Sequence, residues 1–214
     1  MEHPWDRRLG VWWIAEDHPD QPAIVASPSG RTLTFGELAG NAHRLVHALR
    51  ANGFGAGDIV AYALPNDVDP VIWQLACTEM GMRYLALNPA LSATEIDDIL
   101  RHSGAGAVVV HPDFGDRMGE VGDVNTVRLA VSVGGDIPGF LPYEELVAGH
   151  PDTLPDNRVL GGAISYSSGT TGKPKGVVRP PPTSNPPRPR TRCRRSAGRS
   201  GSFPSTACTW CRRA

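Results

Sequence analysis

Residues 166–176 read Tyr-Ser-Ser-Gly-Thr-Thr-Gly-Lys-Pro-Lys-Gly, a run that concentrates groups able to bind phosphate. Gly169 and Gly172 permit backbone angles that other residues avoid, and they let the main chain approach a ligand closely. Exposed amides that follow one another in such a loop form a concave anion site. The remaining polar residues add hydroxyl donors and positive charge: Ser167, Ser168, Thr170, Thr171, Lys173 and Lys175. The run therefore predicts a loop that binds a polyphosphate.

This phosphate loop differs from a Walker A loop. The Walker A pattern requires a glycine, four further residues and then Gly-Lys-Ser/Thr. Here Pro174 stands five positions after Gly169, and Lys173 is followed by that proline. The alternative interpretation is a flexible Ser/Gly surface loop that binds nothing. The length and order of the run favour a binding loop.

Alternating strand and helix patterns precede the phosphate loop and would have to position it. Ser or Thr followed three residues later by Glu, at Thr34 and at Ser92, predicts two helix starts with capping boxes. Further helices are expected at 68–80 and 143–147, and strands at 59–64, 84–87, 107–110, 126–133 and 159–166. The last of these strands runs directly into the loop. The order predicts an α/β fold with a largely parallel sheet flanked by helices.

The phosphate loop resembles the signature of the AMP-forming acyl-CoA synthetases, which belong to the ANL superfamily of adenylate-forming ligases. Other segments that resemble the superfamily follow in the expected order at 34–38, 57–61, 64–66, 81–84, 87–89 and 95–100. The resemblance covers residues 10–178. It implies that residues 1–178 are the truncated N-terminal, AMP-binding domain of an acyl ligase.

The resemblance also implies a two-step reaction, in which an acid and ATP give an acyl-adenylate and pyrophosphate, and coenzyme A then forms a thioester. It implies ATP, Mg²⁺ and CoA as cofactors of the parental full-length enzyme and a small carboxylic acid, expected to be a fatty acid, as substrate. A ligase that loads a carrier protein is the rival within the family. The resemblance assigns distal-phosphate contacts to Thr170, Thr171 and Lys175, whereas the family varies at Lys173. No residue matches the family's catalytic lysine or Mg²⁺-binding acid, so no catalytic or metal residue is assigned.

The chain changes character after Val178. Residues 1–178 contain all 22 acidic residues with 12 Lys and Arg, whereas residues 179–214 contain nine Arg and no acidic residue. The tail also lacks Leu, Ile, Val and Met, so it cannot build a core and is expected to be disordered. Its composition indicates out-of-frame translation of a GC-rich gene, and the chain as given is therefore expected to be truncated and inactive. The alternative is a non-enzymatic product whose Arg-rich tail binds nucleic acid or anionic surfaces.

The remaining features indicate a cytoplasmic protein without a membrane span. No apolar run approaches the length of about 18 residues that a span requires, and the first residues do not resemble a secretory signal. Of the four cysteines, Cys77 stands alone in the body, which does not suggest a disulfide framework. His43 and His47 have the i,i+4 spacing of a metal pair, but no third ligand is apparent. We expect both histidines on a solvated helix face.

Overall fold

The computed structural model of the chain describes residues 10–27, 29–88, 90–117, 125–167 and 175–178. By its internal contacts the chain divides into Met1–Pro181 and Pro182–Ala214, and everything described below belongs to the first unit. The predicted tail, 179–214, and the centre of the phosphate loop, 168–174, lie outside the described residues. The predicted domain boundary after Val178 therefore stays a prediction.

Short helices and strands alternate along most of the described chain. In chain order they are α1 (Gly10–Asp17), β1 (Pro22–Val25), β2 (Thr32–Thr34), α2 (Phe35–Ala51), β3 (Ile59–Ala63), α3 (Asp69–Glu79), β4 (Arg83–Ala86), α4 (Ala93–Ser103), β5 (Ala107–Val110), the 3₁₀ helix η2 (Pro112–Arg117), β6 (Leu129–Ser132), β7 (Leu141–Pro142), α5 (Tyr143–Val147), β8 (Gly162–Ser167) and β9 (Lys175–Val178). None of the helices in this part of the chain is long and apolar enough to cross a membrane.

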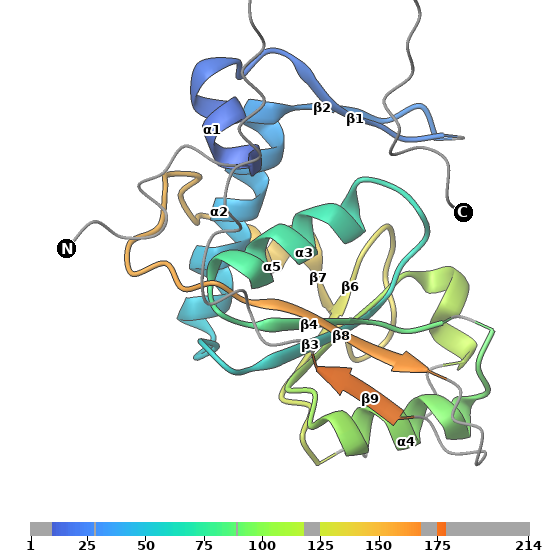
Figure 1. Ribbon diagram of the computed structural model, residues 1–214. Helices are drawn as coiled ribbons and strands as arrows, with labels where there is room; N and C mark the ends of the chain where they lie inside the picture. The colour runs from blue at the N-terminus through green and yellow to red at the C-terminus, as the bar shows by residue number, and fades with distance from the viewer. Residues whose placement is uncertain (1–9, 28, 89, 118–124, 168–174, 179–214) are drawn as a thin grey trace, which may run out of the picture. The chain divides into compact units, whose positions relative to one another are not determined.

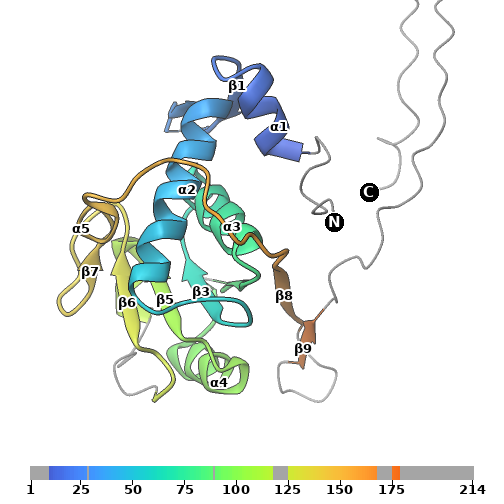
Figure 2. The same ribbon diagram turned by 90° about the vertical axis from the view of Figure 1, so that its left-hand side faces the viewer.

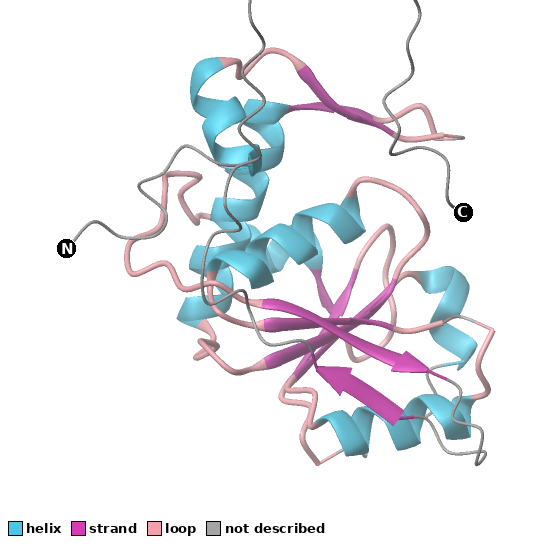
Figure 3. Ribbon diagram, in the orientation of Figure 1, coloured by secondary structure: helices cyan, strands magenta, loops and turns pink. Residues whose placement is uncertain are grey.

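Seven strands form one sheet in the order β7-β6-β5-β3-β4-β8-β9, and β1 pairs separately with β2. Every neighbouring pair in the large sheet is parallel except β8 and β9. Helices α2 and α3 lie on one side of this sheet and α4 lies on the other (Figures 1 and 3). The predicted α/β fold with a largely parallel sheet and flanking helices is confirmed.

The core has two layers because successive residues of a strand point to opposite faces of the sheet. In β3, Val60 and Tyr62 pack in the cluster that contains the buried residues of α2 and α3. Ala61 and Ala63 pack instead with the buried residues of α4. All of these β3 side chains are buried, which explains why the strand reads as a continuous apolar run.

Both predicted capping boxes are present. At the start of α2, the Glu37 amide donates to Thr34 Oγ1 at 3.2 Å, and the Thr34 amide donates to Glu37 Oε2 at 2.8 Å. Ser92 and Glu95 make the same reciprocal pair at the start of α4. The hydrogen bonds from Ser92 lower the pKa of the Glu95 carboxyl below its usual value. These local signals fix the first residues of α2 and α4.

Several strands differ from the predicted elements. The β1–β2 hairpin, β7 and β9 had no predicted counterpart, and β6 and β8 each begin three residues after the predicted start, at Leu129 and Gly162. Residues 159–161 instead bond to the end of α3, because the Val159 amide donates to the Glu79 carbonyl and the Gly161 amide to that of Thr78. The chain therefore docks on a helix before it joins the sheet.

Candidate functional site

The stem of the phosphate loop is a β-hairpin at one edge of the sheet. Strand β8 pairs in parallel with β4 and in antiparallel with β9, which lies next to it in Figure 2. The last rung of the hairpin joins Ser167 to Lys175. These two residues of the predicted site thus lie opposite each other at the neck of the loop. The others lie outside the described residues: Ser168, Gly169, Thr170, Thr171, Gly172 and Lys173. The prediction that a strand leads directly into the loop is confirmed.

The neck of the loop lies where α/β proteins commonly bind ligands. Because β8 is parallel to β4, the carboxyl end of β8 lies at the same end of the sheet as the carboxyl ends of β3, β4 and β5. Crevices outside the carboxyl ends of parallel strands are the usual ligand sites of open α/β sheets. The neck of the loop therefore lies at the end of the sheet where ligands of open α/β folds commonly bind.

One rung below the neck, Tyr166 holds the hairpin against helix α4. Tyr166 is paired with Gly176, and a Cβ atom added at Gly176 would lie only 3.0 Å from Cζ of the tyrosine ring. The Tyr166 hydroxyl lies 2.7 Å from Nδ1 of His102 in the last turn of α4, and the two rings meet edge to face at 5.8 Å. Burial raises the pKa of Tyr166, so the hydroxyl stays protonated and can donate to a neutral imidazole. Glycine at 176 thus allows the close contact that joins both strands to α4.

The two histidines that had metal-like spacing have different surroundings from those expected. His43 is buried, with 8% of its surface exposed, so the prediction of a solvated helix face is wrong for it. Its Nδ1 lies 3.2 Å from the Asp152 carbonyl oxygen, and Nε2 of His47 lies 3.0 Å from that of Thr153. Both imidazoles therefore contact the chain segment that precedes β8. No group of three potential metal ligands occurs within the described ranges.

The family is settled by a match that spans nearly the whole described chain. The family described as AMP-binding enzyme matches residues 11–180, which include all seven strands of the large sheet and the complete phosphate loop. The chain belongs to the AMP-binding enzyme family. The predicted resemblance to adenylate-forming acyl-CoA ligases over residues 10–178 is confirmed.

Individual members of the AMP-binding family show the same relationship. The chain is 30% identical over 169 residues to a 3-hydroxybenzoate–CoA ligase of Aromatoleum sp. (strain CIB), covering 77% of this chain and 32% of that protein. It is 33% identical over 174 residues to a fatty acid–[acyl-carrier-protein] ligase of Streptomyces coeruleorubidus, covering 77% of this chain and 31% of that protein. The structure of an anthranilate CoA ligase in complex with anthranoyl-AMP superposes with a TM-score of 0.68 at 25% sequence identity, covering 78% of this chain and 33% of that one. The chain thus spans about a third of the length of these relatives.

Within this AMP-binding fold, the contact between Tyr166 and His102 gives a first testable prediction. We expect Tyr166→Phe to lower the free energy of unfolding by about 1 kcal/mol, because it removes one hydrogen bond and keeps the ring on Gly176. Urea unfolding of the 214-residue chain measures the change. In a His102→Ala background the same substitution should have a smaller effect, because its partner is already gone. Equal losses in both backgrounds would contradict a direct contact.

Proposed function

We propose that the chain supplies the phosphate-binding part of an ATP-dependent acyl-CoA ligase. The observation that carries the proposal is the hairpin stem, which presents Ser167 and Lys175 at the two ends of a Ser-, Thr- and Gly-rich loop at the carboxyl edge of the sheet. In the first step, a carboxylate oxygen of the acid attacks the α-phosphorus of ATP, and the bond to the bridging oxygen of pyrophosphate breaks. In the second step, the thiolate sulfur of CoA attacks the acyl carbon, and AMP leaves.

In the proposed reaction the loop binds the departing pyrophosphate. The main-chain amides around Gly169 and Gly172 and the hydroxyls of Thr170 and Thr171 would donate to the β- and γ-phosphate oxygens. Lys175 would place a cation beside them, and Mg²⁺ would neutralise further negative charge. Donors that are already oriented toward developing charge stabilise a transition state without reorganising. The proposed binding set is Ser167, Ser168, Gly169, Thr170, Thr171, Gly172, Lys173 and Lys175.

For the acid substrate we propose a fatty or other hydrophobic carboxylic acid, with CoA as the acceptor. Support for the class comes from relatives that are named for 3-hydroxybenzoate and for a fatty acid. The second of these relatives is named as a carrier-protein ligase, so a carrier protein is the competing acceptor. We propose further that the 214 residues alone bind phosphate without turnover, because orienting an acid for in-line attack requires groups from several segments. Acid-dependent AMP formation at an ordinary enzymatic rate would contradict that part.

Two neighbouring lysines provide a matched test of the binding loop. We expect Lys175→Ala to weaken binding of Mg²⁺–pyrophosphate about tenfold or more, because a charge-assisted contact to phosphate is lost. Lys173 belongs to the same proposed set, but the family resemblance leaves its position variable, so we expect Lys173→Ala, which removes the same charge two positions away, to have a much smaller effect. Equilibrium binding to the 214-residue chain, measured at fixed ionic strength, compares the two. Equal losses would indicate general electrostatic attraction in place of a specific site.

A further inference from the structure

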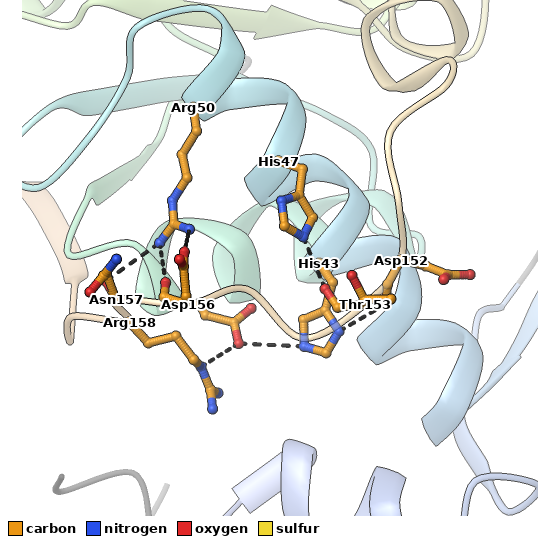
Figure 4. Close-up of polar contacts among 9 residues, drawn as sticks. His43, His47, Arg50, Asp152, Thr153, Asp156, Asn157 and Arg158 are labelled. Atoms are coloured by element: carbon orange, nitrogen blue, oxygen red, sulfur yellow. Dashed lines mark hydrogen bonds and ion pairs between the residues drawn. The ribbon is translucent and has the colours of Figure 1, made fainter.

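Glu79 is the last residue of α3, and its side chain is fully buried by the other described residues. A carboxylate removed from water costs several kcal/mol unless it is paired and hydrogen-bonded. Its Oε1 lies 2.6 Å from Nε of Arg158 and 3.4 Å from Nε2 of His43. Arg158 and His43, both labelled in Figure 4, reach this carboxylate from two different segments of the chain, as the two distances show. The carboxylate is therefore fully buried, and its nearest charged partner is the guanidinium of Arg158.

The arginine belongs to residues 150–159, which connect α5 to β8 and which we call the strap. The strap lies along α2 and is held by side chains that recur every three or four residues on one face of that helix (Figure 4). Besides the two histidine contacts described above, Arg44 pairs with Asp152 at 3.0 Å and Arg50 pairs with Asp156 at 3.0 Å. The two aspartates are 60% and 83% exposed, so each of these ion pairs contributes little to stability.

The pair formed by Glu79 and Arg158 differs from these exposed pairs because it is enclosed. Only 12% of the Arg158 side chain is exposed, and its guanidinium lies 5.0 Å from the ring centroid of Trp12 in α1. Removing one partner of a buried pair leaves an uncompensated charge, which is strongly destabilising. Glu79 therefore holds the end of the strap, at Arg158, by an enclosed pair, whereas the pairs at Asp152 and Asp156 are exposed.

The strap leads directly into the strand that carries the phosphate loop. Immediately after Arg158, the Val159 amide donates to the main-chain oxygen of Glu79 at 3.1 Å. The Gly162 amide then donates to the Met82 oxygen at 3.0 Å, where β8 begins. Glu79 thus holds two consecutive strap residues, one through its side chain and one through its main chain, just before β8.

We propose that Glu79 is a positioning residue for the phosphate loop, acting through Arg158 on the point at which the chain enters β8. The inference rests on the proposed function of the loop. It assigns Glu79 no contact with substrate. A purely structural role predicts something different, namely lower stability with an unaltered phosphate site in the molecules that remain folded.

The test compares Glu79→Gln, Arg158→Gln and the double variant in the 214-residue chain. Glutamine retains the size and shape of the glutamate side chain and removes its charge. Binding of Mg²⁺–pyrophosphate is measured under conditions in which unfolding curves show each variant to be folded, and amide hydrogen exchange is followed in β8 and in β5. We expect Glu79→Gln to weaken binding about tenfold and to accelerate exchange in β8 more than in β5. If the two residues act through each other, the double variant should lose no more than either single variant.

Arg50→Gln is the matched control, because it breaks an exposed contact of the same strap. It should change neither binding nor exchange in β8 appreciably. Unchanged pyrophosphate affinity in folded Glu79→Gln, or unchanged exchange in β8, would overturn the inference. Failure of the unmodified chain to bind pyrophosphate would overturn the proposed function instead. The exchange rates of β8 would then still decide whether Glu79 positions that strand.

Discussion

Gly161→Ala is expected to separate the start of β8 from the end of α3 and to lower the free energy of unfolding by about 3 kcal/mol or more. A Cβ atom at this position would overlap the main-chain oxygens of Met82 and Cys77, and it would lie 2.9 Å from the Met82 nitrogen. These are backbone atoms, which cannot rotate away as a flexible side chain could. The hydrogen bond of 2.7 Å from the Gly161 amide to the Thr78 oxygen would be strained by the same displacement.

The neighbouring glycine provides the control for this steric argument. A Cβ atom at Gly162 meets nothing within 4 Å, so Gly162→Ala should leave stability almost unchanged. Urea unfolding measures both variants, and the thiol of Cys77 reports on the same contact. Burial raises the pKa of Cys77 to about 12, so its alkylation, mapped by mass spectrometry, should be slow unless the region opens. Similar alkylation rates in the two variants would contradict the steric account.

The two alanine substitutions also differ in their expected effect on ligand binding. Gly161 lies in the segment that docks on α3 before β8 begins, and β8 leads to the neck of the proposed phosphate site. We therefore expect Gly161→Ala, and not Gly162→Ala, to impair binding of Mg²⁺–pyrophosphate. A loss of binding that parallels only the unfolded fraction would restrict the role of Gly161 to stability.

The elements that the sequence predicts well depend on local signals. The capping boxes at Thr34 and Ser92 lie within four consecutive residues, and the apolar run of β5 is read directly from Ala107–Val110. The phosphate-binding chemistry assigned to residues 167–175 likewise comes from local composition, and it stays a prediction. Such signals fix elements and motifs, but they do not fix which strand lies beside which.

The features that the sequence does not predict depend on segments distant along the chain. His43 looks like a residue of a solvated helix face until the strap covers it, and no local signal at Glu79 indicates its pairing with Arg158, 79 residues further along the chain. The contact between His102 and Tyr166 joins residues 64 positions apart. Strand β9 has a weak strand pattern, with Gly176 in a four-residue segment, and it is formed by pairing with β8. The start of helix α2 is predictable because the two residues of its capping box lie close together along the chain. The charged contacts on the surface of this helix are not predictable, because their partners lie in a distant segment.

Trp73→Ala is expected to have the other large effect on stability, with a loss of about 3–5 kcal/mol. Trp73 of α3 is the largest fully buried side chain among the described residues, with 1% of its surface exposed, and it packs in the core layer on the α2 and α3 side of the sheet. Its ring centroid lies 6.2 Å from that of Tyr143, the first residue of α5. A domain of ordinary stability has only about 5–15 kcal/mol in total, so the variant should lie close to the limit of folding.

The control for Trp73 is Trp13→Ala on helix α1, because Trp13 is 36% exposed and loses much less apolar burial when truncated. We expect the urea midpoint to fall far more for Trp73→Ala, and Trp73→Phe to recover part of the difference. Since α5 leads directly into the strap, loss of the contact with Tyr143 should also accelerate hydrogen exchange in α5 before global unfolding. Equal midpoints for the two tryptophan variants would mean that the core layer does not depend on this ring. The connection from the core through α5 to the strap, and from there to β8, would then need a different physical basis.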